Sequence, residues 1–444
     1  MTIQLPSDVK FIMDHLEDNG YEAYAVGGCV RDTLLGRIPQ DWDITTMAKP
    51  EQVKELFDRT IDTGIAHGTV TIMIGKMGYE VTTYRIDGEY EDARHPKEVI
   101  YTANLLEDLK RRDFTINAMA YNERNGLVDA FDGIGDLKEH MIRCVGDAKE
   151  RFSEDALRML RAIRFAAQLG FRVEDKTLDA ITELSGNLDK VSAERIQVEL
   201  VKLLVSEHPG EMERIYKTGI AAVILPEWKA MMETPQNNPY HCYNVGRHTI
   251  CALEQIRADK VLRLSAWLHD IAKPTCRTTD EQGIDHFYGH PTEGAMQAKK
   301  LLRRLKFDNA TIDAVVRLVA GHDENPALTE KSVRRMIRKT GADAYPYIFE
   351  LKLADTLAHS TYKREEMLQY LKDYQKLYQQ IIDREDCLSL KNLAVNGRDL
   401  MELGVKPGQQ IGQILNALLE LVVEDPEKNT KEYLIGYTLK NLFI

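Results

Sequence analysis

Segments that resemble β-strands are confined to the first 130 residues of this chain, and helical periodicity dominates from about residue 150. Residues 69–74 and 79–84 are two β-rich runs around Lys76-Met77-Gly78, a pattern typical of a hairpin. Later segments repeat apolar residues every three to four positions, as amphipathic helices do. The sequence therefore predicts an α/β domain with a mixed sheet, followed by all-helical domains.

The same patterns predict the remaining elements and the division into domains. With 444 residues the chain is too long for one ordinary hydrophobic core, so two to four domains are expected. Residues 234–239 (TPQNNP) are the best linker candidate, because they are rich in proline and asparagine. Strands are expected at 23–26 and 41–45, and helices at 9–19, 31–35, 53–56, 154–169, 193–205, 249–258, 295–305 and 367–382.

The composition is that of a soluble globular protein of the cytoplasm. Hydrophobic residues make up 43% of the chain and charged residues 29%, which argues against disorder. No run of about 18 apolar residues occurs, and the first ten residues lack the pattern of a secretory signal, so no membrane association is expected. The six cysteines include no C-x-x-C pair, which favours neither a disulfide framework nor a zinc knuckle.

Charge is distributed unevenly along the chain. The first 150 residues hold 17 basic and 28 acidic residues, whereas the remaining 294 hold 41 and 42. An acidic first domain suits an active site that uses metal ions. Basic clusters at 299–306 (KKLLRRLK) and 334–339 (RRMIRK) are either contacts for RNA phosphates or solvated faces of amphipathic helices.

The first candidate site combines glycines, an arginine and two aspartates. Gly27-Gly28 follows a predicted strand and precedes a predicted helix that carries Arg31, an arrangement that lets backbone amides and a guanidinium approach a phosphate. Period-2 alternation places Asp41 and Asp43 on one face of a strand, about 6 to 7 Å apart. Two such carboxylates repel each other unless a cation lies between them, and hard oxygen ligands suit Mg²⁺. The alternative for Asp-x-Asp alone is a solvent-facing strand edge or turn.

Glu80 lies on the second strand of the predicted hairpin. Its carboxylate is either a third acidic group near the metal or an exposed strand residue.

Two further motifs have the composition of a nucleotide-binding site. Residues 111–117 (RRDFTIN) join two arginines to Asp113; they could bind a triphosphate and a ribose hydroxyl, or form a helix N-cap with a salt-bridged first turn. In residues 154–164, Glu154-Asp155 precedes three arginines spaced three apart, at 158, 161 and 164. Asp155 and Arg158 present acceptor and donor groups that could read a base.

Arg161 and Arg164 have no acidic residue three or four positions away. Either a bound triphosphate neutralises them, or they pair with acidic side chains of another element.

Together these motifs resemble the family of class II tRNA nucleotidyltransferases and bacterial poly(A) polymerases. Their order and spacing agree throughout residues 20–205, which makes the resemblance highly specific. The matching segments are 27–36 (GGCVRDTLLG), 39–45 (PQDWDIT), 80–85 (EVTTYR), 111–117, 129–137 (DAFDGIGDL), 151–171 and 194–204 (ERIQVELVKLL).

The resemblance implies an activity and a role for each residue. A polymerase-β-like head would use Asp41 and Asp43 to hold Mg²⁺ while an RNA 3′-hydroxyl attacks the α-phosphate of CTP or ATP and pyrophosphate leaves. Asp155 and Arg158 would select C and then A in place of a nucleic-acid template. Gly28 and Arg31 would bind the triphosphate, Arg112 and Asp113 phosphate and ribose, and Arg161 and Arg164 the nucleotide.

Two other segments narrow the subclass. Residues 87–96 (DGEYEDARHP) resemble the loop that the family needs to add the final A, which argues against CC-only addition. Residues 390–429, with NGRDL at 396–400 and GVKPG at 404–408, resemble the tail of CCA-adding enzymes and would hold the tRNA elbow. The implied domains are a head at 1–145, a neck at 146–232, a middle domain at 240–360 and a tail at 361–444.

The middle domain contains a second candidate site. His269-Asp270 lies within an apolar helical segment, where a buried aspartate needs a partner or a metal. The ordered set of histidines and aspartates resembles the HD phosphohydrolase domain, which implies a divalent-metal site and phosphatase or 2′,3′-cyclic phosphodiesterase activity, used in repair of RNA ends. Four residues would bind the first metal (His248, His269, Asp270 and Asp355) and two match second-metal positions (His290 and His322).

The leading hypothesis is therefore a CCA-adding enzyme that binds tRNA, CTP and ATP. An A-adding tRNA nucleotidyltransferase and a poly(A) polymerase are alternatives within the class. An HD phosphohydrolase with an RNA-binding head is an alternative of another class, and a non-catalytic tRNA-binding protein is a third. The paired aspartates argue against the last, because RNA binding requires no clustered carboxylates.

Overall fold

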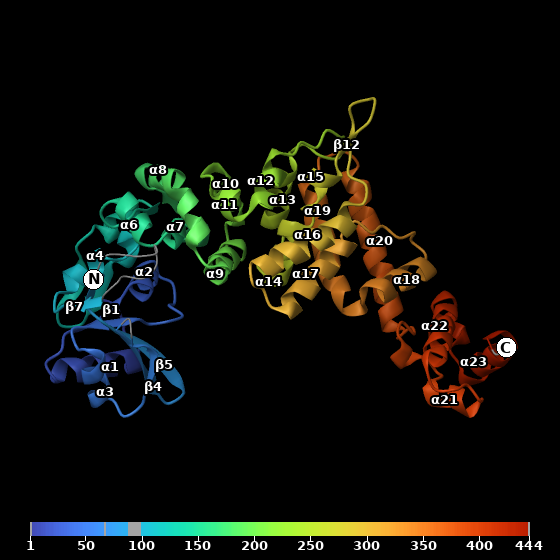
Figure 1. Cartoon of the computed structure of the whole chain (residues 1–444), viewed down its shortest axis with the longest axis horizontal. Coiled ribbons are helices and arrows are strands. Elements are labelled where there is room, and N and C mark those ends of the chain that lie inside the picture. The colour runs from blue at the N-terminus through green and yellow to red at the C-terminus, as the bar shows by residue number, and fades with distance from the viewer. Residues whose placement is uncertain (1, 66–67, 88–98, 443–444) are drawn as a thin grey trace. The chain divides into compact units, whose positions relative to one another are not determined.

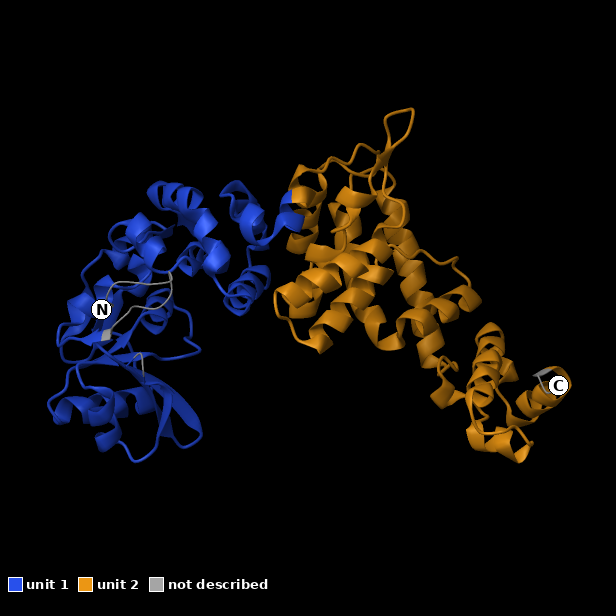
Figure 2. Cartoon of the chain, viewed as in Figure 1, with its two compact units in different colours: residues 1–229 blue, residues 230–444 orange. Residues whose placement is uncertain are grey.

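A computed structural model describes residues 2–65, 68–87 and 99–442 of the chain. The chain divides into two compact units, residues 1–229 and 230–444, which are described separately below (Figure 2).

A seven-stranded mixed sheet is the centre of the first unit (Figure 1). Strands β2 and β5 run parallel, and all other neighbours in this sheet run antiparallel. The strands, in spatial order, are β3 (Thr60–Gly64), β4 (Thr69–Ile74), β5 (Met77–Thr83), β2 (Ile44–Thr46), β1 (Ala23–Val26), β8 (Met119–Asn122) and β9 (Gly126–Asp129).

The predicted hairpin is confirmed, and its turn lies one residue earlier than expected. Ile74 and Met77 are the last paired residues of β4 and β5, so Gly75 and Lys76 form the turn. Gly75 has a φ of 60°, a backbone conformation that glycine adopts at little cost. Strand β1 has the predicted bounds and is buried along its whole length, as expected for a strand in the middle of a sheet.

Helices surround this sheet and then continue without it. The long predicted helix at 154–169 is interrupted, because Asp155 has an extended backbone (φ −141°) and its Oδ1 accepts a hydrogen bond from the Leu157 amide at 3.1 Å. The helices are α1 (Ser7–Asp18), α2 (Gly28–Leu34), α3 (Pro50–Leu56), α4 (Leu105–Lys110), α5 (Gly133–Lys138), α6 (Ala148–Glu154), α7 (Leu157–Leu169), α8 (Asp175–Leu184), α9 (Ala193–Leu204), α10 (Met212–Lys217), α11 (Ile220–Ile224) and α12 (Pro226–Glu233).

The first unit also contains two small strand pairs. They are β6 (Arg85–Asp87) with β7 (Val99–Tyr101), and β10 (Met141–Ile142) with β11 (Arg172–Val173).

The second unit is mainly helical, as the sequence predicts. The predicted helix at 295–305 begins five residues earlier, at His290, after Gly289 with a φ of 77°. A two-stranded ribbon, β12 (Thr278–Thr279) and β13 (Asp285–His286), interrupts the helices. These are α13 (Val245–Gln255), α14 (Lys260–Leu268), α15 (Lys273–Cys276), α16 (His290–Arg304), α17 (Asn309–Gly321), α18 (Glu330–Thr340), α19 (Tyr345–Ala358), α20 (Arg364–Asp383), α21 (Gly397–Glu402), α22 (Gln409–Glu424) and α23 (Lys431–Tyr437).

The second unit has more than one apolar core. Helices α18, α19 and α20 share an aromatic cluster that includes Tyr345, Phe349 and Tyr374. A separate cluster joins α21, α22 and α23 around Leu400, Leu418 and Leu434. The four-domain division predicted from the sequence is finer than the two compact units and stays a prediction.

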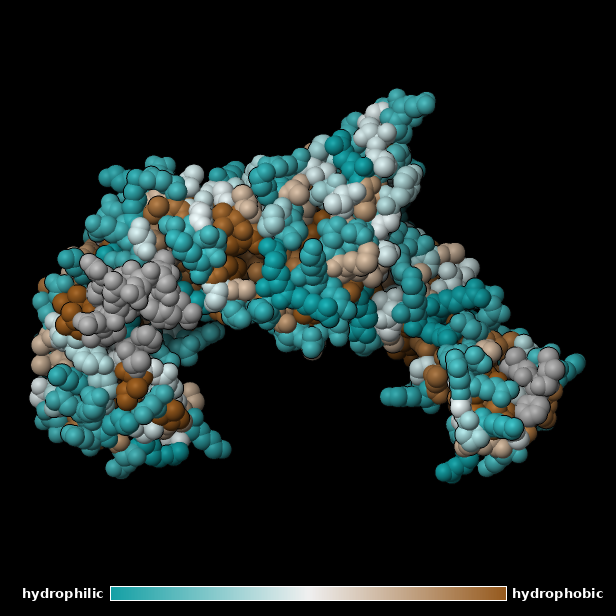
Figure 3. All heavy atoms as spheres, in the orientation of Figure 1, coloured by the Kyte–Doolittle hydropathy of each residue, from teal (hydrophilic) through white to brown (hydrophobic). Residues whose placement is uncertain are grey.

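Polar side chains cover most of the face shown in Figure 3. Among the described residues, no helix is both long enough and apolar enough to cross a lipid bilayer.

We predict that Gly246→Ala destabilises the second unit. A Cβ added there would lie 2.3 Å from Met232 Sδ and 2.8 Å from the Met232 Cα, too close for either atom. Met232 lies in residues 230–233, the part of α12 that belongs to the second unit. Because the backbone there would have to shift, we expect a loss of about 1–3 kcal/mol, measured by thermal unfolding followed by circular dichroism.

Gly412→Ala is the matched control, because it is also a helical glycine but its Cβ would meet no atom within 4 Å. It should raise stability by up to about 1 kcal/mol, the ordinary gain for Gly→Ala in a helix. Equal midpoints for the two variants would contradict the steric argument.

Candidate functional sites

Asp41 and Asp43 lie in the extended segment that leads into β2, at the centre of the sheet. The strand itself begins at Ile44, later than predicted, but the Val26 amide donates to the Asp43 carbonyl at 3.0 Å and so ties the segment to β1. Both aspartate side chains are exposed. The sheet thus presents the two carboxylates to solvent from a rigid base.

Glu80 lies beside this pair because of the strand register. Ile44 of β2 is opposite Val81 of β5 in the parallel pair, and the residues preceding them are Asp43 and Glu80. Desolvation raises the pKa of Glu80, and the charges of Asp43 and Asp41 raise it further. Desolvation and Asp41 also raise the pKa of Asp43, while Arg112 opposes them. Three acidic groups therefore repel one another here, and a bound cation would relieve that repulsion.

Of the arginines expected to bind phosphate, Arg112 lies near enough to act on the charge of Asp43. The Arg112 guanidinium packs so tightly on Gly27 that a Cβ there would lie 3.0 Å from Nη1. Arg112 Nη2 also lies 3.4 Å from Asp108 Oδ2. Arg31 is buried and donates from Nη1 to Asn117 Oδ1 at 2.7 Å. Gly28 is the first residue of α2, directly after Gly27, which has a φ of 80°.

Asp113 is a buried acceptor that joins the head to α7. Its Oδ1 accepts from the Phe114 amide at 2.8 Å and from Asn117 Nδ2 at 3.1 Å, and its Oδ2 accepts from Arg161 Nε at 2.8 Å. Burial alone would raise the pKa of Asp113, but the Arg161 charge and these hydrogen bonds hold it well below its ordinary value. Asp113 is therefore a structural anion in this structure.

The arginine stripe of α7 is paired with acidic side chains of other elements, which was one of the two sequence-based readings. Arg161 contacts Asp113, and Arg164 Nε donates to Glu199 Oε2 of α9 at 2.7 Å. Both side chains of the Arg164–Glu199 pair are at most 6% exposed. A triphosphate is therefore not needed to explain why these arginines lie close together.

Asp155 and Arg158 lie close in sequence but bind different partners. Arg195 of α9 forms hydrogen bonds to both carboxylate oxygens of Asp155, at 3.2 and 2.7 Å. Arg158 Nη1 donates to Glu154 Oε2 at 2.6 Å, as the i,i+4 spacing predicts, and Nη2 donates to the Arg111 carbonyl at 2.8 Å. Their predicted role in base selection stays a prediction.

Other predicted segments have different outcomes. The loop expected to support A addition, 87–96, lies outside the described residues except for Asp87.

In the basic cluster of α18, Arg334 pairs with Asp386, Arg335 with Glu424, and Arg338 with Glu420. These arginines join α18 to later elements of the second unit, which favours a structural role for that cluster.

In the second unit, the six predicted metal ligands converge on one point. Three lie in helices α13, α16 and α19 (His248, His290 and Asp355), and three directly follow helices α14 and α17 (His269, Asp270 and His322). His248 and Asp355 come from α13 and α19, and their side chains meet at 2.8 Å (Nε2 to Oδ1). Asp270 Oδ2 lies 3.2 Å from His269 Nε2, and Asp270 Oδ1 lies 3.5 Å from His290 Nε2. His290 Nε2 and His322 Nε2 are 3.2 Å apart. The two Asp270 oxygens thus face two histidine groups, a donor set that fits a pair of divalent ions.

Three histidines of this cluster are oriented by backbone carbonyls. The Nδ1 atoms of His269, His290 and His322 lie 2.8, 2.8 and 2.7 Å from the carbonyls of residues 266, 287 and 319, which act as acceptors. Each contact fixes the orientation of the ring and directs Nε2 toward Asp270, the arrangement that metal-binding histidines use.

The buried carboxylates of this cluster are balanced by neighbouring positive charge. His269 and Asp270 are at most 1% exposed. Burial opposes their charged forms, but Asp270 and Asp355 raise the pKa of His269 to about 10. His269 and Lys273 in turn hold the pKa of Asp270 far below its ordinary value despite burial. Buried carboxylates of this kind require compensating positive charge.

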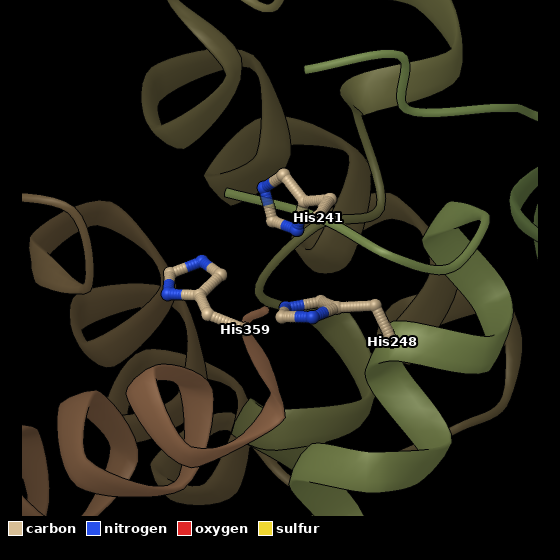
Figure 4. Close-up of side chains that lie close together, drawn as sticks. All are labelled: His241, His248 and His359. Atoms are coloured by element: carbon tan, nitrogen blue, oxygen red, sulfur yellow. The ribbon is translucent and has the colours of Figure 1, made fainter. Parts of the chain in front are cut away.

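Two histidines that sequence reasoning missed lie against this cluster. His241, His248 and His359 form a triangle of imidazoles whose candidate ligand atoms all lie within 4.8 Å of one another (Figure 4). His359 follows Asp355 by four residues and directly follows α19, a spacing that could have revealed it. His241 lies in an irregular segment before α13, where no periodic signal exists.

Lys273 was also missed, although it follows Asp270 by three residues. Its Nζ lies 2.7 Å from Asp270 Oδ2 and donates to Gln236 Oε1 at 2.7 Å.

A mixed sheet with paired carboxylates, followed along the chain by a helical region, is the architecture of a nucleotidyltransferase of the poly(A) polymerase type. The family model described as "Poly A polymerase head domain" matches residues 23–143. "Probable RNA and SrmB-binding site of polymerase A" matches residues 170–232, and a tRNA nucleotidyltransferase domain 2 matches residues 279–437.

Comparison with whole proteins gives the family. The chain is 36% identical to the CCA-adding enzyme of Lactobacillus helveticus, over 96% of this chain and 95% of that protein. It is also 36% identical to the enzyme of Lactiplantibacillus plantarum, over 98% and 97%. The solved CCA-adding enzyme of Bacillus stearothermophilus in complex with CTP is 27% identical, with a TM-score of 0.69 over 97% of both chains. This chain belongs to the CCA-adding enzyme family.

We predict that Glu199→Ala strongly destabilises the first unit. It removes the partner of buried Arg164 and leaves an uncompensated guanidinium, at a cost of about 3–5 kcal/mol in urea unfolding. The control Glu183→Ala breaks the pair with Lys149, in which both side chains are more than half exposed, and should change stability little. Equal losses would contradict the assigned importance of burial.

We also predict that Asp41→Asn lowers the pKa values of Asp43 and Glu80, because it removes a neighbouring negative charge. Carboxyl ¹³C NMR titration of the metal-free chain measures both values. Folding raises these pKa values, so stability should fall as the pH rises from the ordinary carboxyl pKa through the raised one, and less steeply in Asp41→Asn. Unchanged pKa values would contradict the proximity of the three carboxylates.

Proposed function

We propose that this chain completes the 3′ end of tRNA by adding C, C and A from CTP and ATP without a nucleic-acid template, releasing pyrophosphate. One observation carries the proposal: a whole-length relative named as a CCA-adding enzyme is 36% identical over 96% of the chain. The carboxylate cluster of Asp41, Asp43 and Glu80 provides the chemistry that this reaction needs.

A divalent metal belongs to nucleotidyltransferase chemistry, and we propose Mg²⁺, held by Asp41 and Asp43. The oxygen-only donor set suits Mg²⁺. Desolvation and, beyond it, the neighbouring carboxylate charges raise the pKa values of Asp43 and Glu80, and this concentration of negative charge supports a bound cation. When bound, this ion would favour attack of the RNA 3′-hydroxyl and neutralise charge on the phosphates. Glu80 would serve as a third acidic group beside the ion.

The chain's own residues would hold the nucleotide in place. Arg112, which lies near Asp43 and against Gly27, would receive the triphosphate, together with Arg31 and the Gly27-Gly28 backbone. Arg161 would act through Asp113, and Arg164 through Glu199, by fixing α7 beneath the nucleotide. For Asp155 and Arg158 to read a base, each would exchange a present partner, Arg195 or Glu154, for the base edge.

We further propose that the chain has four functional parts and works in the cytoplasm. The head would comprise residues 1–145, the neck 146–232, a metal-binding middle part 240–360, and a tRNA-binding tail 361–444. The tail cluster around Leu400, Leu418 and Leu434 supports a separately packed tail.

A second activity is proposed for the histidine and aspartate cluster, which resembles an HD phosphohydrolase site. The observation that favours it is the convergence of His248, His269, Asp270 and Asp355, with His290 and His322 sharing Asp270. Water would attack a phosphorus atom, one P–O bond would break, and the released ribose oxygen would take up a proton. A divalent metal pair would supply Lewis acidity to that reaction when bound.

Reciprocal variants test both activities in one protein. Asp41→Ala should reduce CCA addition by at least about a hundredfold while leaving hydrolysis of a phosphorylated RNA end unchanged. His269→Ala should do the opposite. The assay extends a tRNA that lacks its 3′ end, with Mg²⁺, CTP and ATP, and follows hydrolysis separately with a transition metal.

The controls use single nucleotides. A CCA-adding enzyme extends a tRNA that lacks CCA with CTP alone and a tRNA that ends in CC with ATP alone. An A-adding enzyme does not extend the tRNA that lacks CCA. A poly(A) polymerase, given ATP, adds A to both tRNAs. Full CCA addition by Asp41→Ala would overturn the proposed role of the head.

A further inference from the structure

The histidine and aspartate cluster of the second unit (His248, His269, Asp270, His290, His322 and Asp355) borders a cavity with an aromatic wall. A cavity of about 560 Å³ is lined by Asp270, Lys273, His290 and His322 together with aromatic side chains. A second cavity, of about 380 Å³, shares Tyr240, His322, Asp355 and His359 with the first, so the two adjoin at the metal ligands. The aromatic side chains of the larger cavity are Tyr240, His241, His286, Phe287, Tyr288 and His359.

Tyr288 is held in place beside the metal ligands. Its ring stacks on His286, with centroids 5.3 Å apart and planes 6° from parallel, and its hydroxyl lies 3.3 Å from His286 Nδ1. Asp280 Oδ2 lies 2.8 Å from His286 Nε2 and so holds the histidine ring in place. Yet Tyr288 is 78% exposed, two residues before His290. His286 is therefore fixed from one side, and the Tyr288 ring that stacks on it lines the cavity.

A second aromatic pair borders the same space. Tyr240, which lines both cavities, meets Tyr362 edge to face, with centroids 5.1 Å apart. The two rings are 39% and 45% exposed. Lys363 lines the smaller cavity and lies 5.7 Å from the Tyr362 centroid. This combination of an exposed aromatic ring and a cation suits a base followed by a phosphodiester.

Exposed, pre-oriented aromatic rings next to a metal site restrict the class of ligand. A phosphate alone needs cations and hydrogen-bond donors, and it gains nothing from stacking. Nucleobases stack on tyrosine whatever their sequence, and two separate aromatic pairs provide for more than one base.

We propose that the cavity binds the end of a single RNA strand, with one base stacked on Tyr288, a second on Tyr240, and the terminal phosphate at the metal cluster. This inference rests on the proposed phosphohydrolase activity and specifies its substrate. Tyr288 and Tyr240 are then specificity-determining residues, which act on substrate binding rather than on the chemical step.

The test compares three substrates of the full-length chain loaded with Mn²⁺. They are a tetraribonucleotide that ends in a 2′,3′-cyclic phosphate, the corresponding 2′,3′-cyclic mononucleotide, and glycerol 1,2-cyclic phosphate, which has no base. Tyr288→Ala should raise KM about tenfold for both nucleotides and leave kcat nearly unchanged. Tyr240→Ala should raise KM for the tetranucleotide alone. Neither variant should alter hydrolysis of the glycerol ester.

Matched variants separate stacking from general damage. Tyr288→Phe keeps the ring and should behave as the wild type. Tyr433→Ala removes a tyrosine of similar exposure (43%) from α23 and should change nothing. Equal losses on all three substrates, or no loss for the tetranucleotide in either cavity variant, would overturn the proposal.

A binding measurement separates this inference from the proposed activity. Fluorescence anisotropy measures affinity for the labelled tetranucleotide in the His269→Ala background, where turnover is not required. Tyr288→Ala should weaken binding about tenfold there. If the wild type hydrolyses none of the substrates, the phosphohydrolase proposal fails, and this binding result alone then decides whether the cavity takes an RNA end.

Discussion

Repulsion among three carboxylates at the middle of the sheet is the constraint on which the catalytic head depends. The parallel register of β2 and β5 brings Glu80 beside Asp43, and the Asp-x-Asp spacing adds Asp41. Desolvation raises the pKa of Asp43 and Glu80, and the neighbouring carboxylate charges raise both further, so negative charge is concentrated at this point of the sheet. The seven strands and the tie between Val26 and Asp43 keep the three groups together in spite of that repulsion.

Buried arginine–carboxylate pairs then connect this sheet to the helices that follow. Asp113 accepts hydrogen bonds from its own loop and from Arg161 of α7, and Arg164 pairs with Glu199 of α9. Because each carboxylate is buried, loss of one partner leaves a charge without compensation. These ion pairs hold α7 against Asp113 and against α9 and so stabilise the fold, which means that substitutions there will lower stability whatever else they change.

The elements that local sequence patterns define were predictable, and the long-range pairings were not. Strand β1 and hairpin β4–β5 follow from alternation, and the grouping of six histidines and aspartates in the second unit was expected from the order of a known domain. The partners of Arg164 and Asp155 lie 35 and 40 residues away on α9, where no spacing rule applies. The break at Asp155 was missed because apolar periodicity continues across it. His241 was missed because irregular segments carry no periodic signal.

Counting bound Mn²⁺ by electron paramagnetic resonance, in the presence of CTP, tests the central claim most directly. The claim is that Asp41, Asp43 and Glu80 form the cation site of the head. In the full-length chain, Asp43→Asn should abolish the CTP-dependent Mn²⁺ signal and nucleotidyl transfer together, while His269→Ala retains both. If Asp43→Asn binds Mn²⁺ with wild-type number and affinity in the presence of CTP, the carboxylate cluster is not the metal site and the account of the head is wrong.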